Sequence, residues 1–279
     1  MPIFSVRGWN HIVLKIGGFG QIKDMGSAPV RNLLYDHTFE SIKAEGEIYD
    51  FKQYRNYGID TTALDNLYNA CNELSRIPNL KLWIVAGGTG AFMFIDLARR
   101  LGFSAQEQQR IGVEMSQIYS EIVMKALGAR GVRIHPKLVD ISECAEASRD
   151  DSVCYVARPS SKSMSTDALG CAIAANHQVD FVVFKSYASW IEKIWRYIGF
   201  GSEVPSHIDI SELKHIMRNR IDGPGQNFFL DKQSIEIIED RQINLCLYDT
   251  NKINELTEIY HNRLEPILTI IGRKERYLV

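Results

Sequence analysis

Residues 82–90 read Leu-Trp-Ile-Val-Ala-Gly-Gly-Thr-Gly, an apolar run that ends abruptly in glycines. A helix-forming stretch, residues 91–100, follows at once. A buried strand that opens through glycines into a helix leaves backbone N–H groups uncovered at the positive end of that helix, which suits a phosphate or another anion. Residues 12–18, Ile-Val-Leu-Lys-Ile-Gly-Gly, repeat the strand that ends in glycines. Neither segment matches the P-loop or the dinucleotide signature, so we expect phosphate binding of another type.

Lys15 and the glycines of the two segments are the first candidates for phosphate contacts. Lys15 ends the first run and is a mobile point charge that can reach an oxyanion. The glycines that would supply backbone donors are Gly17, Gly18, Gly87, Gly88 and Gly90. The plainer alternative is that these glycines only make tight turns and that Lys15 only ends a strand. Two such turns at the ends of two predicted parallel strands favour binding, because open α/β sheets bind ligands there.

Composition excludes several classes of function. The 279 residues carry a net charge of −2 and are 45% hydrophobic and 24% charged, which gives no reason to expect a nucleic-acid or membrane partner. The start of the sequence lacks the apolar segment of a signal peptide, and no apolar run is long enough to span a bilayer. The five scattered cysteines form no C-x-x-C pair, which indicates reduced thiols rather than disulfides or a zinc site. We therefore expect a soluble, cytoplasmic protein.

Hydrophobic periodicity and capping signals predict alternating helices and strands. Residues 19–57 show weak periodicity and are expected to hold a long loop or an insertion. Predicted helices cover 62–77, 91–100, 104–127, 168–175, a segment from 209, 231–239 and 253–260; predicted strands cover 12–16, 82–86, 131–142, 151–158, 180–185, 244–248 and 266–271. This alternation predicts an α/β fold with a mostly parallel sheet covered on both faces.

The order of these motifs resembles the amino acid kinase superfamily, and within it the uridylate-kinase-like branch that includes the molybdenum storage protein. The matching motifs, in chain order, are Lys15-Ile16-Gly17-Gly18, Gly87-Gly88-Thr89, the helix with Gln109-Arg110-Ile111-Gly112, the pair Thr166-Asp167, and Asp231 before the strand at 244–248. The resemblance implies a three-layer α/β/α sandwich over residues 1–279. It also implies an acceptor side over about 1–159, a nucleotide side over about 160–279, and ATP with Mg²⁺ as cofactors.

The resemblance also implies roles for single residues. Lys15 and Asp167 would be catalytic, with Lys15 neutralising charge in the transition state and Asp167 holding it in place. The glycines named above, Thr89, Thr166, Lys185 and Asp231 would bind phosphate or nucleotide. From the residues alone, Ser165 with Asp167 could equally cap a helix, and Asp231 reads better as a cap than as a ligand. We expect no metal held by protein residues alone, since the histidines are dispersed and Mg²⁺ would arrive with the nucleotide.

Three departures from the branch's pattern separate the alternatives. Gln109 stands where uridylate kinases carry an acid that binds the acceptor ribose, and residues 186–190 and 265–266 replace two nucleotide-binding turns. The first hypothesis is therefore an ATP-dependent kinase whose small acceptor is not UMP. The second is a nucleotide-binding storage protein for molybdenum or tungsten oxyanions, and the third is a catalytically silent kinase-like subunit. In each case we expect an oligomer, either of this chain alone or with a related subunit, around a small molecule or oxyanion.

Overall fold

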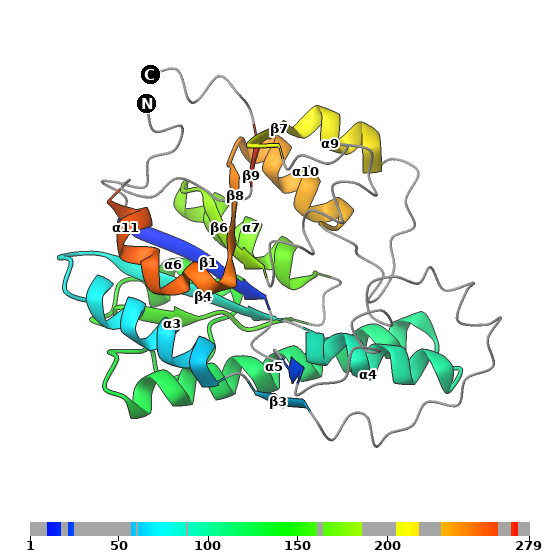
Figure 1. Cartoon of the computed structure of the whole chain (residues 1–279), viewed down its shortest axis with the longest axis horizontal. Coiled ribbons are helices and arrows are strands. Elements are labelled where there is room, and N and C mark those ends of the chain that lie inside the picture. Colours follow the sequence, from blue (N-terminus) through cyan, green and yellow to red (C-terminus); the bar gives the residue numbers. More distant parts are fainter. Residues whose placement is uncertain are drawn as a thin grey trace.

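A computed structural model of the whole chain describes residues 10–17, 22–24, 57–59, 61–87, 89–160, 164–185, 205–217, 230–261 and 269–272. Its centre is a seven-stranded sheet with the order β5-β4-β1-β6-β8-β9-β7 (Figure 1). The strands are β1 (His11–Gly17), β4 (Lys81–Gly87), β5 (Cys154–Val156), β6 (Phe181–Lys185), β7 (His207–Asp209), β8 (Leu245–Asp249) and β9 (Thr269–Gly272).

Five neighbouring strands of this sheet, β5 to β8, run parallel. β9 is antiparallel to β8 and parallel to β7. The prediction of a mostly parallel sheet is confirmed. β1 and β4 are nearly continuous runs of buried apolar residues. Such runs are typical of parallel strands that are covered on both faces.

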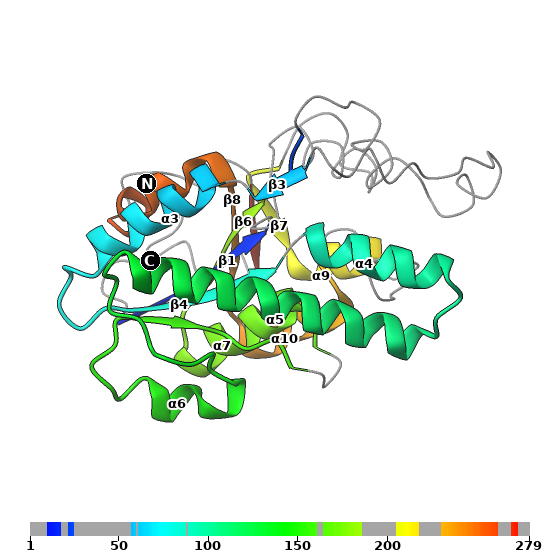
Figure 2. The same ribbon diagram turned by 90° about the horizontal axis from the view of Figure 1, so that it is seen from below.

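Helices cover both faces of the sheet (Figures 1 and 2). One face is covered by α3 (Thr61–Leu74), α5 (Ala105–Ala129), η3 (Thr250–Glu255) and α11 (Leu256–Tyr260). The other is covered by α7 (Thr166–His177), α9 (Ile210–Met217) and α10 (Lys232–Arg241). The predicted α/β/α layers are therefore present.

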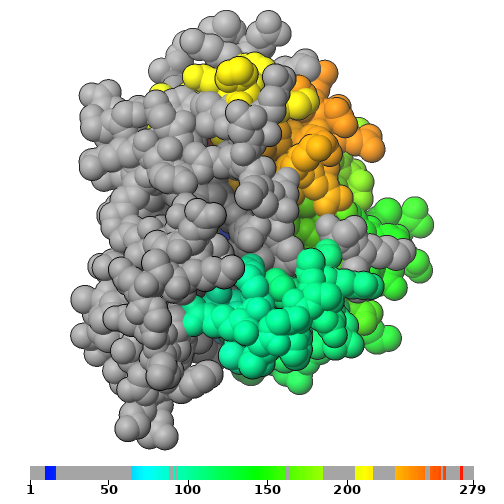
Figure 3. Space-filling view, turned by 90° about the vertical axis from the view of Figure 1, so that its right-hand side faces the viewer, coloured from blue at the N-terminus to red at the C-terminus, as the bar shows by residue number. Residues whose placement is uncertain are grey.

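The remaining elements lie outside these layers or at their margins. α4 (Thr89–Arg100) packs along α5, and the two helices form one arm of the molecule (Figure 2). In the view of Figure 3, this arm lies at one end of the coloured surface, and α9 and α10 lie at the other. The short elements are η2 (Ile141–Glu143), α6 (Cys144–Ala147) and the two-stranded sheet of β2 (Ile22–Asp24) and β3 (Tyr57–Ile59).

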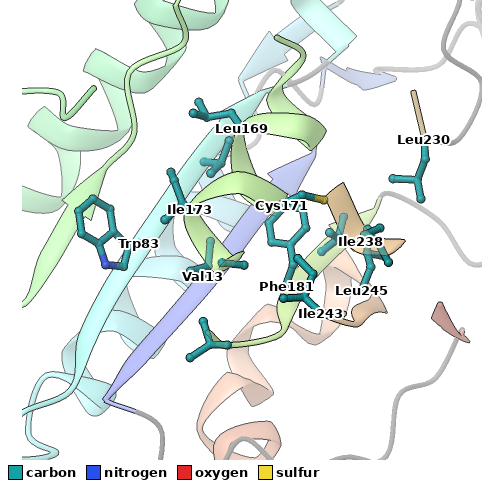
Figure 4. Close-up of a cluster of buried hydrophobic side chains, with 14 of the residues drawn as sticks. Val13, Trp83, Leu169, Cys171, Ile173, Phe181, Leu230, Ile238, Ile243 and Leu245 are labelled. Atoms are coloured by element: carbon teal, nitrogen blue, oxygen red, sulfur yellow. The ribbon is translucent and has the colours of Figure 1, made fainter. Parts of the chain in front are cut away.

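Residue alternation along the strands divides the core into two clusters. Ile12, Leu14 and Ile16 of β1 pack toward α3 and α5. Val13 points to the opposite face, where Phe181 and Cys171 lie between α7 and α10 (Figure 4). Because successive strand residues alternate between faces, Lys15 shares the face of Val13.

Most predicted elements match the structure to within a few residues, but two do not. A strand over 131–142 was expected, whereas these residues make only isolated bridges at Ile134 and Val139 and then enter η2. That prediction is wrong because Pro136 lacks the N–H a ladder needs and Asp140 caps a helical turn, with its carboxylate accepting from the Ser142 N–H. The helix predicted at 253–260 starts as a 3₁₀ helix at Thr250 and becomes α-helical at Leu256.

No helix among the described residues is both long enough and apolar enough to cross a membrane.

Candidate functional site

The carboxyl ends of β1 and β4 meet the amino end of α7 at one edge of the sheet. β1 and β4 are parallel and in register, so that Gly17 lies beside Gly87 at their ends. Lys15, two residues before the end of β1, lies beside Val85 of β4 and Val183 of β6. Its side chain therefore projects from the middle of the sheet, and only 6% of the residue is exposed.

Lys15 and Asp167 form a buried ion pair. The Lys15 Nζ donates to Asp167 Oδ1 at 2.5 Å, and the Asp167 residue is 8% exposed. Asp167 is in the first turn of α7, which begins because Ser165 adopts an extended conformation and accepts from the Ala168 N–H at 3.0 Å. The alternation of side chains along β1 directs Lys15 toward α7, and the Ser165 cap fixes where α7 begins. Together they bring the charges of Lys15 and Asp167 into contact.

A second carboxylate, Asp231, joins this cluster from the start of α10. Asp231 caps α10 by accepting from the Ser234 N–H at 2.8 Å, and the Ser234 hydroxyl donates to it at 2.7 Å. The Ser165 hydroxyl also donates to Asp231. The two helix caps are therefore hydrogen-bonded to each other, which fixes the amino ends of α7 and α10 relative to one another.

Cys171 lies among these three charges. Burial raises the pKa of its thiol well above the ordinary value, Asp167 and Asp231 raise it further, and Lys15 lowers it. Ser234 is hydrogen-bonded to the same thiol. Figure 4 shows Cys171 on α7 with its sulfur directed toward α10. A buried thiol with a raised pKa is typical of a structural cysteine rather than of a reactive one.

Gly87 brings the end of β4 directly against the start of α7. A Cβ built on Gly87 would lie 2.6 Å from the Thr166 Oγ1 and 3.0 Å from the Thr166 Cβ, so any larger residue would force the Thr166 side chain to shift. This close approach places the amino end of α7 over the junction of β1 and β4. The glycine at the end of the apolar run is therefore needed for packing, whatever it binds.

The other predicted site residues lie near the same edge or outside the described residues. Thr89 and Gly90 open α4, directly after β4. Lys185 ends β6 beside Asp249 of β8. Gly18 and Gly88 lie outside the described residues, as do the two altered turns at 186–190 and 265–266.

Sequence reasoning missed Ser234 and Cys171 as members of the cluster. Asp231 is itself a recognisable N-cap residue, but nothing in the sequence marks Ser234, because a capping box has Glu or Gln at that position. Cys171 had no signal either, since its place depends on α7 packing against α10. Among the described residues, no group of three or more His, Cys, Asp or Glu side chains could hold a metal ion.

The geometry suits the handling of a charged group at this edge. Lys15 is a buried ammonium whose position is fixed by Asp167, and the amino ends of two helices carry partial positive charge. Fixed charges in a buried site act more strongly on a ligand than the same charges in water. Two carboxylates and one ammonium leave this cluster with an excess of negative charge.

Comparison with solved structures identifies the fold. The UMP kinase of Bacillus anthracis superposes with a TM-score of 0.60 at 13% identity, covering 95% of this chain and 97% of that one. The UMP kinase of Ureaplasma parvum gives 0.58 at 14% identity, covering 96% and 98%. The uridylate kinase of Archaeoglobus fulgidus gives 0.53 at 19% identity, covering 76% and 94%.

The chain has the uridylate kinase fold. Uridylate kinases belong to the amino acid kinase superfamily, so the expected fold resemblance is confirmed. No protein-family profile matches the chain, and no curated protein matches it significantly in sequence. At these identities the likeness establishes a kinase-like fold, and the activity has to be argued from the site itself.

Proposed function

We propose that the protein is an ATP-dependent phosphotransferase that acts on a small acceptor other than UMP. The observation that carries this proposal is the buried Lys15–Asp167 pair at the carboxyl edge of β1. Burying the Lys15–Asp167 pair costs free energy, because both charges lose their hydration. A buried ion pair kept at this cost is a candidate for a functional role. Neutralising a transferring phosphoryl group is such a role.

Phosphoryl transfer asks the protein for positioning and charge neutralisation rather than for a nucleophile. In the proposed reaction an acceptor oxygen forms a bond to the γ-phosphorus of ATP while the bond to the β–γ bridging oxygen breaks, which releases ADP. Lys15 would contact the equatorial oxygens, and Asp167 would keep its ammonium aimed at them.

The donor set fits a Mg²⁺ ion that arrives with the nucleotide. Asp167 and Asp231 offer carboxylate oxygens, which Mg²⁺ prefers, and Mg²⁺ typically takes one or two carboxylates together with substrate phosphates. The two carboxylates outnumber the single positive charge of the Lys15 ammonium. A bound triphosphate therefore requires further positive charge at this site. When bound, Mg²⁺ would supply that positive charge, and Asp167 and Asp231 are the residues that would hold it.

The acceptor is proposed to differ from UMP because of Gln109. This residue lies half-buried on α5, at the position where the resemblance places an acid that binds the acceptor ribose. A neutral amide in that place accepts a hydroxyl hydrogen bond more weakly than a carboxylate. UMP should therefore lose part of its binding energy here.

The test is calorimetric titration of the purified full chain with ATP and Mg²⁺, followed by an acceptor screen that measures ADP release. The screen includes UMP, other nucleoside monophosphates and small carboxylates. Lys15→Met should lower turnover at least 100-fold, by analogy with the loss of one oxyanion donor. The matched control Lys137→Met, at an exposed position outside the site, should retain full turnover. Full turnover in Lys15→Met would refute the assignment of Lys15.

The same experiment separates the two alternatives. Binding of ATP without turnover, together with co-purified molybdenum or tungsten, would favour an oxyanion storage protein. An absence of ATP binding at millimolar concentration would favour a catalytically silent subunit. Light scattering on the same sample tests the proposed oligomer.

A further inference from the structure

A polar pocket lies at the opposite edge of the sheet from the candidate site, where β4 begins. It has a volume of about 320 Å³ and lies between the turn after α3 and the loop before β5. Sites for small molecules typically start at about this volume. Since β4 runs from Lys81 in this pocket to Gly87 at the candidate active site, the two sites lie at opposite ends of one strand.

The pocket wall carries more positive than negative charge. Arg76, Lys81 and Arg133 line it together with one carboxylate, Asp151. The field inside a concave surface lined mostly by one sign of charge attracts ligands of the opposite sign. The wall therefore favours an anion.

Lys81 is held at the pocket wall by three acceptors. Its ammonium donates to the carbonyl oxygens of Asp150 and Ser152, each at 2.7 Å, and to the Tyr155 hydroxyl at 3.2 Å. These three contacts use all three ammonium donors. Lys81 thus contributes a fixed positive charge to the pocket and leaves direct hydrogen bonding to the arginines.

The guanidinium groups of Arg76 and Arg133 are available for a ligand. Both residues are exposed, and neither forms an ion pair with another described residue. Arg76 follows the last turn of α3, but the carbonyl groups of that turn do not need its side chain as a hydrogen-bond donor. The backbone N–H groups of Ser75, Arg76 and Ile77 already donate to the carbonyls of Cys71, Glu73 and Leu74.

We propose that this pocket binds a small phosphomonoester. Each guanidinium presents a planar fork of donors that matches the oxygens of a phosphate group. Asp151, as an acceptor on the same wall, suits a hydroxyl group on the remainder of the ligand. The pocket is independent of the proposed phosphotransferase activity, because it shares no residue with the Lys15 cluster.

The experiment is calorimetric titration of the full chain with ribose 5-phosphate and, separately, with inorganic phosphate. Both are expected to bind, and ribose 5-phosphate should bind more tightly because its hydroxyl groups reach Asp151. Arg76→Gln and Arg133→Gln should each weaken binding of ribose 5-phosphate about tenfold. Arg149→Gln, at an exposed position that does not line the pocket, is the matched control and should change nothing.

Lys15→Met distinguishes this pocket from the candidate active site. Binding of ribose 5-phosphate that persists in Lys15→Met and is lost in the double arginine variant supports the pocket, even if the chain proves to have no kinase activity. Binding that is lost in Lys15→Met and kept in the double arginine variant would overturn the proposal. So would an absence of binding by the unmodified chain at about 10 mM ribose 5-phosphate.

Discussion

Replacing Lys15 by Met tests whether the buried ion pair holds the candidate site together. The substitution removes the ammonium while keeping a flexible side chain of similar length. It leaves Asp167, with 12% of its side chain exposed, as a buried carboxylate without its counter-ion. Breaking a buried pair in this way typically costs about 3–5 kcal/mol. We expect about 3 kcal/mol, since both side chains keep a small contact with solvent.

For a chain of this size, 3 kcal/mol corresponds to a fall of about 6 °C in the melting temperature. Differential scanning calorimetry of the unmodified chain, Lys15→Met, Asp167→Asn and the double variant measures it. Each single variant breaks the ion pair and keeps one of its two charges, whereas the double variant removes both charges. The double variant should therefore be about 2 kcal/mol more stable than the sum of the two single losses predicts.

Additive losses in the double variant would refute this reasoning, as would single losses below about 1 kcal/mol. Either result would mean that Lys15 and Asp167 are each solvated independently. Agreement between calorimetry and far-ultraviolet circular dichroism checks that the four proteins unfold in one cooperative step.

Three further predictions concern the caps, the close approach and the dependence on pH. Asp231→Ala should lower the free energy of unfolding by about 2 kcal/mol in urea titrations, because α10 loses its cap and the Ser165 hydroxyl loses its acceptor. Gly87→Ala should cost about 1–3 kcal/mol in the same assay, and adding Thr166→Ala should recover part of it, because the new methyl would overlap the threonine side chain. Burial, His177 and Lys81 together lower the pKa of His11 to about 4, so the unfolded chain binds more protons between about pH 6.5 and pH 4. Stability should therefore fall by about 1–2 kcal/mol as the pH falls through that window, and His11→Phe should reduce the fall.

Each of these predictions has a result that would count against it. If Asp231→Asn were as unstable as Asp231→Ala, the loss would come from the charge of the carboxylate rather than from its hydrogen bonds. A loss in Gly87→Ala that Thr166→Ala does not relieve would place the overlap elsewhere. A pH dependence that is unchanged in His11→Phe would assign the acid sensitivity to other groups.

The order of helices and strands could be predicted from local patterns. The capping box that begins α5 appears in the structure as expected, with Ser104 and Glu107 each bonded to the other's backbone. The small-residue helix α7 and the buried strand β6 also match, because their signals depend on residues close in sequence. The antiparallel direction of β9 and the presence of β7 were not predicted, since strand pairing depends on contacts between distant segments.

The roles proposed for Lys15, Asp167 and Asp231 illustrate the same division. The sequence placed Lys15 near the end of a strand and both aspartates at the start of helices, and the structure agrees. Whether Asp167 caps α7 or holds Lys15 stayed open from the residues alone. The structure gives the cap to Ser165 and pairs Asp167 with Lys15, while Asp231 is a cap as expected.

The sequence by itself determined the class of fold, because apolar runs, glycine turns and helix caps are local signals that specify elements and their order. It also determined which side chains stand at the carboxyl ends of the strands. Only the tertiary structure decided that Lys15, Asp167, Asp231 and Cys171 surround one point. Their contacts join β1, α7 and α10, and such contacts depend on how elements more than 60 residues apart pack together.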